Sequence, residues 1–163
     1  MRKPSGAVNN GRMELIAKDV DVPSPVLARD VEPLIRSLRP ALTGPGFTAF
    51  ATEAAGQGLV FTAAYDNSAA GKGRCVGVAT HRTLATSRGR VLFVDDLVTD
   101  PALRSHGVGA WLMAELEQRA ARSGCARVEL DSGVVNQGAH RFYHARRMSV
   151  VAFHFALDVP QHR

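Results

Sequence analysis

The sequence predicts a mixed α/β fold in a chain of 163 residues. Three observations carry this prediction: apolar residues alternate with a period of two in stretches such as 59–65, they recur with helical spacing in stretches such as 108–120, and both kinds of stretch interleave in the second half. The expected order is two helices, three strands, a helix, a strand, a helix and a strand. An antiparallel start therefore gives way to a strand–helix–strand crossover.

Composition places the chain among ordinary globular proteins. Hydrophobic residues make up 45% and charged residues 21%, and the formal net charge is +5. No apolar run is long enough to span a bilayer or to form a signal peptide, so we expect a cytoplasmic location and no membrane partner. Arg and Lys are scattered, without aromatic interleaving or a reader motif, which favours an anionic small molecule over a specific nucleic acid.

Residues 1–12 are polar and aperiodic, so we expect a flexible tail there. The rest of the chain, 13–163, is expected to form a single domain. A first helix follows Asp30 as its N-cap, because Val31, Leu34, Ile35 and Leu38 share one face, and Pro40 ends it. A second helix covers 47–55, after the breaker TGPG. Strands are expected at 59–65 and 75–80 around the turn 66–73, with a connection at 82–89.

The stretch 91–99 (VLFVDDLVT) is apolar on both faces apart from its two aspartates, which indicates a central strand. A helix runs from Val108 to Gly124, and RVELD at 127–131 is a strand. A short helix at 137–146 and a long final strand at 148–159 complete the predicted domain.

The loop RSHGVGA, residues 104–110, joins the central strand to the next helix. Such a loop points the unpaired amides of the first helical turn at one spot, where the helix dipole favours an anion, and Arg104 adds a charged donor. Glycine at 107 and 109 lets ligand oxygens approach the backbone, although a tight turn alone would also explain them. Leu112 replaces the third glycine of a dinucleotide fingerprint, and no Lys-Ser or Lys-Thr pair completes a P-loop.

These residues resemble the GNAT N-acetyltransferases, whose pyrophosphate loop reads [RQ]-x-x-G-x-[GA] directly after a strand. Arg104, Gly107 and Gly109 match that loop, and the run Asn136-x-x-Ala139-x-x-Phe142-Tyr143 is similar to a second family motif. The resemblance covers about residues 58–158. It implies the GNAT fold, a mixed sheet whose central parallel pair splays to admit acyl-CoA, flanked by helices. One departure is Arg147-Met148, where the family usually has Gly-Phe.

The resemblance implies acetyl-CoA as cosubstrate, with no metal, and an unidentified primary amine as acceptor. The pantetheine arm would pair with the strand backbone at Leu97 and Thr99, as an added strand. The implied cofactor-binding residues are Leu97, Val98, Thr99, Arg104, Ser105, His106, Gly107, Val108, Gly109, Ala110, Asn136 and Tyr143.

Direct attack of the amine on the thioester needs a base and an acid. The resemblance makes Tyr143 the acid for the CoA sulfur, whereas the bare sequence favours a place for it in the core. Asp95 and Asp96 should point to opposite faces of their strand, so at most one serves as base, and we prefer Asp96. A buried structural carboxylate is the alternative there, and Glu129 and Asp131 are reserve candidates.

The remaining chemistry-bearing residues predict no further site. Cys75 and Cys125 are expected as reduced, small core residues, and the histidines lack a metal-ligand pattern. The run 111–113 is either core or the contact with a partner subunit in a homodimer. A catalytically silent acyl-CoA-binding module on the same fold is the main alternative to an enzyme, with nucleic-acid binding a weaker one.

Overall fold

The computed structural model describes residues 13–160, so the expected tail at 1–12 lies outside the described residues. The chain divides into two compact units after Glu129, and each is described by itself. The expectation of a single domain over 13–163 therefore stays a prediction. Among the described helices, none is long and apolar enough to cross a membrane.

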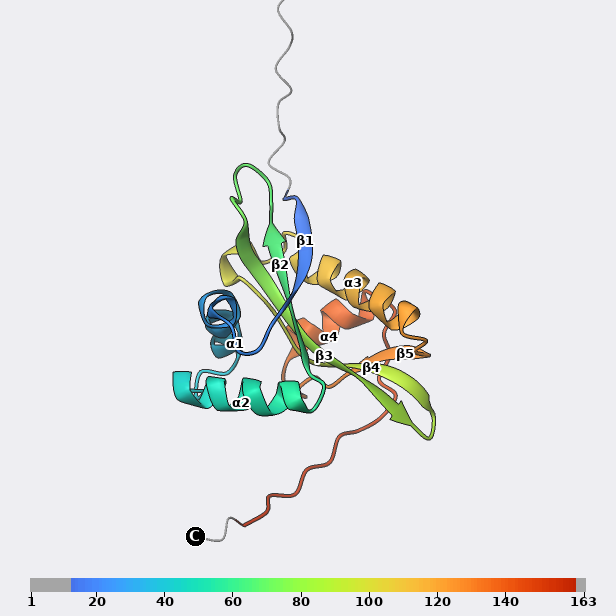
Figure 1. The fold of residues 1–163 in the computed structure, drawn as a ribbon. Coiled ribbons are helices and arrows are strands. Elements are labelled where there is room, and N and C mark those ends of the chain that lie inside the picture. The colour runs from blue at the N-terminus through green and yellow to red at the C-terminus, as the bar shows by residue number, and fades with distance from the viewer. Residues whose placement is uncertain (1–12, 161–163) are drawn as a thin grey trace, which may run out of the picture. The chain divides into compact units, whose positions relative to one another are not determined.

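Five strands form one mixed sheet in sequence order (Figure 1). The strands are β1 (Leu15–Val20), β2 (Val60–Asp66), β3 (Arg74–Thr86), β4 (Gly89–Thr99) and β5 (Arg127–Leu130). β1 to β4 pair antiparallel, and β5 lies beside β4 in parallel. At the beginning of this parallel pair, the amide of Ala126 donates to the carbonyl of Arg90 at 2.7 Å. The predicted antiparallel start and parallel crossover are confirmed.

One face of the sheet is covered by η1 (Leu27–Val31), α1 (Glu32–Leu38) and α2 (Gly44–Gly56) (Figure 1). Their buried side chains Val31, Ile35 and Phe47 form one cluster with Phe61 of β2 and Val78 of β3. We call this side of the sheet the α1 face.

The other face carries α3 (Val108–Arg122), which contacts β1, β3 and β4. Val108, Leu112 and Leu116 of α3 are buried, as the predicted helical stripe requires. Leu112 and Met113 thus belong to the core, and of the run 111–113 only Trp111 is partly exposed. We call this side the α3 face.

Three local predictions in the first half are wrong. β1 was not expected, because its apolar stretch LIA is short and is followed by two charged residues. Asp30 is not an N-cap, since it lies inside η1 and accepts a hydrogen bond from the Tyr65 hydroxyl at 2.7 Å. The motif TGPG does not precede the helix as a breaker, because α2 begins within it. Thr43 is the N-cap of α2 and accepts from the amide of Gly46 at 3.1 Å. Pro45 lies in the first turn, where its missing N–H costs no helical hydrogen bond.

The expected connection at 82–89 is also wrong, because β3 and β4 continue as a hairpin as far as Thr86 and Gly89. Polar side chains on this extension hid its strand character, and they are exposed in the structure.

The second unit contains α4 (Gln137–His144), close to the predicted helix at 137–146. The predicted strand at 148–159 is wrong in this structure, where those residues are irregular and Val150, Val151, Phe153, Phe155, Leu157 and Val159 are 70 to 91% exposed. Strand pairing needs backbone partners as well as alternating side chains. Residues 131–160 contain no strand, so this unit supplies no backbone partners for 148–159.

Candidate active site

The loop between β4 and α3 is built from local backbone interactions. The Asp100 carboxylate accepts from the amide of Ala102 at 2.8 Å and opens the short 3₁₀ helix η2 (Pro101–Leu103). Arg74, at the beginning of β3, forms an ion pair with the same carboxylate. Ser105 and Gly107 then take left-handed φ values of 66° and 85°. Two such residues so close together turn the chain sharply into α3.

The first turn of α3 presents free amides. Its first intrahelical bond runs from the amide of Trp111 to the carbonyl of Gly107 at 2.9 Å, and Gly107 provides no side-chain cap. The amides of Val108, Gly109 and Ala110 therefore precede the helical ladder and have no acceptor in it. Arg104, Ser105 and His106 are exposed beside them. A helix start with three free N–H groups is suited to a phosphate or diphosphate.

Gly107 serves this loop through its conformation. A Cβ placed there would meet no protein atom within 4 Å, whereas the φ of 85° is unfavourable for residues other than glycine. The backbone conformation is thus one requirement for glycine, and the expectation that Gly107 lets ligand oxygens approach the backbone stays a prediction.

Gly77 of β3 holds the beginning of α3 close to the sheet, and no sequence motif singles this glycine out. A Cβ at Gly77 would lie 3.0 Å from side-chain atoms of both Val108 and Leu112 and 3.2 Å from the carbonyl of Val98. The missing side chain lets the helix approach β3 at the turn that presents the free amides.

The last residues of β4 lie next to this loop in the chain. Leu97 and Thr99 pair with Ala79 and Gly77 of β3, and the Val98 side chain packs against the cluster of the α1 face. β3 thus lies along one edge of β4, and β5 lies along the other edge.

A β-bulge changes the expected geometry of the two aspartates. The register of β3 with β4 shifts here, since Thr80 pairs with Asp96 and His81 pairs with Val94, which leaves Asp95 as the extra residue. Arg82 donates to Asp95 at 2.7 and 3.1 Å, and the Thr80 hydroxyl approaches Asp96 at 3.4 Å.

Thr80 and Arg82 are two residues apart on β3 and so share the α1 face. Both aspartates are bonded from that face, and the expected opposite orientation is wrong, because the bulge breaks the alternation. Asp96 also accepts from Arg39, the C-cap residue of α1, at 2.8 Å. Two carboxylates, each paired with an arginine, are thus gathered beside the end of β4.

Comparison with family models shows the family to which the chain belongs. Residues 31–148 match the model of the acetyltransferase (GNAT) family. The chain belongs to the GNAT family. The resemblance stated from the loop and from the Asn136 to Tyr143 run is confirmed, and so is the fold class. No curated protein matches the chain.

Solved structures share the GNAT fold over nearly their whole length. The aminoglycoside N-acetyltransferase AAC(6')-Iy, in complex with a bisubstrate analog, is 15% identical with a TM-score of 0.74, and the match covers 91% of this chain and 99% of that one. A ribosomal-protein-alanine N-acetyltransferase from Brucella melitensis is 16% identical with a TM-score of 0.73, covering 90% and 100%. An acetyltransferase from Trypanosoma brucei is 24% identical with a TM-score of 0.67, covering 90% and 100%. At these identities the likeness shows the fold.

Two GNAT-motif residues lie in the second unit, on α4. Asn136 is the N-cap, accepting from the amide of Ala139 at 3.2 Å, as the capping interpretation predicts. Tyr143 packs edge to face against Phe142, with 5.3 Å between ring centroids. Burial raises the pKa of the Tyr143 phenol above its ordinary value, so the hydroxyl keeps its proton at neutral pH.

Arg147 takes the backbone conformation of the glycine that GNAT proteins usually carry there. Its φ is 61°, and the amide of Met148 donates to the carbonyl of Tyr143 at 3.2 Å. The turn after α4 therefore keeps a left-handed residue despite the substitution, at a cost of about 1 kcal/mol relative to glycine.

The two reserve carboxylates are each engaged elsewhere. Glu129 lies 3.5 Å from Arg127 and 4.0 Å from Arg88. Asp131 contacts His154 at 2.9 Å. Cys75 and Cys125 are free and partly buried, and burial raises the pKa of the Cys75 thiol to about 11, which leaves it unreactive at neutral pH.

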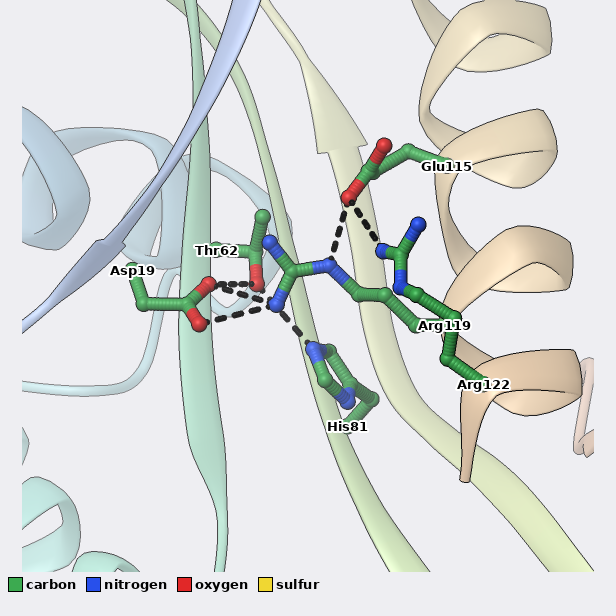
Figure 2. Close-up of polar contacts among 6 residues, drawn as sticks. All are labelled: Asp19, Thr62, His81, Glu115, Arg119 and Arg122. Atoms are coloured by element: carbon green, nitrogen blue, oxygen red, sulfur yellow. Dashed lines mark hydrogen bonds and ion pairs between the residues drawn. The ribbon is translucent and has the colours of Figure 1, made fainter. Parts of the chain in front are cut away.

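A second polar cluster on the α3 face was not anticipated from the sequence (Figure 2). We call it the Arg119 cluster, and it contains Asp19 of β1, Thr62 of β2, His81 of β3, and Glu115, Arg119 and Arg122 of α3. Arg119 bridges Asp19 at 2.7 and 2.8 Å to Glu115 at 2.8 Å. Its members come from four elements, so only the i, i+4 spacing of Glu115 and Arg119 was visible in the sequence.

Proposed function

We propose that this GNAT protein transfers an acetyl group from acetyl-CoA to a primary amine. The observation that carries the proposal is the helix start with three free amides, from Val108 to Ala110, next to the exposed Arg104. An anionic diphosphate such as that of CoA complements these donors. The structural neighbour AAC(6')-Iy has been solved in complex with CoA, which supports the same class of cosubstrate here.

The acyl-CoA would lie along the end of β4. The diphosphate would contact residues 104–110, and the pantetheine amides would bond the backbone of Leu97 and Thr99. Val98 fixes this stretch by packing into the α1 face. Asn136 would contribute near the pantetheine, in addition to capping α4.

Transfer would proceed by direct attack of a neutral amine on the thioester carbonyl. The amine nitrogen forms the new C–N bond, the C–S bond breaks, and the sulfur leaves as a thiolate that needs a proton. Tyr143 would supply that proton, consistent with a phenol that burial keeps protonated. Asp96 would accept the proton lost by the amine once the amine has replaced Arg39 on its carboxylate.

The acceptor is proposed only as a primary amine. Two structural neighbours are an aminoglycoside N-acetyltransferase and a ribosomal-protein-alanine N-acetyltransferase, which have unlike acceptors on one fold. The homodimer and the cytoplasmic location stay predictions.

A silent acyl-CoA-binding module remains the competing function, and the arginine that already occupies Asp96 is the observation that favours it. Free-thiol release from acetyl-CoA with a panel of amines separates the two. We expect thiol release by the wild type with at least one amine, and a loss of about 100-fold in kcat for Tyr143→Phe with unchanged CoA affinity. Binding of acetyl-CoA without thiol release for any amine would establish the silent module, and no binding at all would contradict both.

A further inference from the structure

A pocket of about 530 Å³ opens on the α3 face, beside the Arg119 cluster. It lies between the beginning of β2, the middle of β3 and the last turns of α3. Its polar lining comprises Asp19, His81, Thr83, Arg119, Arg122 and Ser123, together with Arg82, whose guanidinium is paired with Asp95. The GNAT reaction proposed above uses none of these residues.

The hydrogen bonds of the cluster fix the state of His81 (Figure 2). The Thr62 hydroxyl has one proton and donates it to Asp19 at 2.7 Å, so it must accept from Nε2–H of His81 at 3.0 Å. Burial, and next the nearby Arg119, lower the pKa of His81, so the ring is neutral at neutral pH. Nδ1 therefore carries a lone pair.

This lone pair has no hydrogen-bond partner among residues 13–160, and the His81 residue as a whole is 6% exposed. The Nδ1 atom itself is open to solvent, because Ser132 Oγ is the one buried side-chain nitrogen or oxygen without a partner in the described chain. His81 lines the pocket, so a ligand bound there can reach Nδ1.

The same pocket has guanidinium donors to spare. Arg119 uses Nε for Glu115 and Nη1 for Asp19, and within the described chain its Nη2 makes no hydrogen bond. Arg122 is 62% exposed, and its contact with Glu115 is long, at 3.4 Å. Asp19, which also lines the pocket, accepts from Nη1 of Arg119 and from Thr62, so it leaves Nη2 of Arg119 available.

The free groups define the complementary ligand. Two guanidinium groups bind an oxyanion, and the imidazole lone pair can accept from an O–H group on the same molecule. The volume exceeds that of a bare phosphate ion and lies in the range of small-molecule sites. We propose that this pocket binds a small phosphorylated molecule that carries a hydroxyl group, with the phosphoryl group on Arg119 and Arg122 and the hydroxyl on Nδ1 of His81.

This site is separate from the proposed acyl-CoA site. Arg119 and Arg122 lie in the last turns of α3, whereas the free amides lie in its first turn, roughly 14 to 21 Å away along the helix axis. The proposal therefore does not depend on the proposed acetyl transfer.

The test uses ribose 5-phosphate as the probe and the imidazole NMR signals of His81 as the readout. We expect saturable shifts of the His81 signals in the wild type, and affinity about tenfold weaker in Arg122→Ala, because one charge-assisted contact is lost. Arg127→Ala removes an exposed arginine outside the pocket and should bind like the wild type. Ribose has no anion and sulfate has no proton at neutral pH, so both should bind more weakly than ribose 5-phosphate.

Unchanged His81 signals at saturating probe would overturn the proposal, as would equal affinities of Arg122→Ala and Arg127→Ala. Sulfate binding as strong as that of ribose 5-phosphate would show that Nδ1 takes no part. Because the readout is at His81, phosphate bound only at the β4–α3 loop is distinguishable from binding here.

Discussion

Each face of the GNAT sheet has an arginine that reaches from a helix to a strand carboxylate, but the two pairs are exposed in opposite ways. On the α3 face, Arg119 is 19% exposed and its partner Asp19 is 52% exposed. On the α1 face, Arg39 is 59% exposed and its partner Asp96 is 10% exposed. Arg119 also bonds a second carboxylate, whereas Arg39 makes a single contact at 2.8 Å.

This difference separates a structural contact from an exchangeable one. Removing Arg119 would break the link between β1 and α3, since its guanidinium bonds Asp19 of β1 as well as Glu115 of its own helix. Burial alone would raise the pKa of Asp19, yet the hydrogen bonds from Arg119 and Thr62 lower it overall, which shows how fully the carboxylate is engaged. Arg39 can leave Asp96 without disturbing the core, and another cation from solvent can take its place.

The largest effect should follow from Arg119→Ala. We expect a loss of about 2–3 kcal/mol in the free energy of unfolding, measured by urea denaturation, because two carboxylates lose their common partner. Arg122→Ala is the matched control and should cost less than about 1 kcal/mol. Equal losses for the two variants would contradict the structural role of Arg119.

Gly77→Ala tests the other end of α3. Its Cβ would press against Val108 and Leu112, so we expect a loss of about 2 kcal/mol in stability and weaker CoA binding, measured by denaturation and calorimetry. In Gly56→Ala, where a Cβ meets nothing within 4 Å, stability should not fall. Undiminished stability of Gly77→Ala would mean that α3 can move away from β3 without cost.

His81 gives the α3 face a pH dependence near neutral pH. Because burial lowers the pKa of His81 below its unfolded value of 6.5, the unfolded chain binds the proton first. The stabilising contribution is complete above pH 6.5 and is lost as the pH falls through the folded pKa, with a slope of at most about 1.4 kcal/mol per pH unit.

We therefore expect the wild type to lose more stability between pH 7 and pH 5 than His81→Gln does. His106→Gln, at an exposed histidine of the loop, should behave like the wild type. Parallel curves for the wild type and His81→Gln would show that His81 does not titrate differently in the folded protein.

The structural features that depend on residues close together in the chain could be predicted from the sequence. The loop from Arg104 to Ala110 and the cap at Asn136 were visible because their residues are consecutive or three apart, and the family motifs matched them. The crossover from β4 through α3 to β5 followed from hydrophobic periodicity. The exposed side chains at 82–86 and the short apolar run at 15–17 failed this criterion, so part of the hairpin and all of β1 were missed.

Features that depend on distant partners could not be predicted. Asp19 and Arg119 are 100 residues apart, and Asp96 and Arg39 are 57 apart. The bulge at Asp95 depends on the register with β3, so the assumed alternation placed the two aspartates on opposite faces. Gly77 was overlooked because only the approach of Val108 and Leu112 explains it.

Arg39→Ala should have the smallest effect on stability, and it is the sharpest test of the difference between the Arg39–Asp96 and Arg119–Asp19 pairs. The pair Arg29–Asp30 is a close match, with 70% and 11% exposure against 59% and 10%, so Arg29→Ala is the control. Each variant should cost less than about 1 kcal/mol in the free energy of unfolding, because the arginine that is lost is mostly solvated. Only Arg39→Ala should lower the KM for an amine acceptor, since only Asp96 lies at the proposed acceptor site, where the incoming ammonium competes with a guanidinium. The same KM in both variants would make Arg39–Asp96 a structural pair, and a raised KM in Arg39→Ala would mean that Arg39 binds the acceptor instead of competing with it.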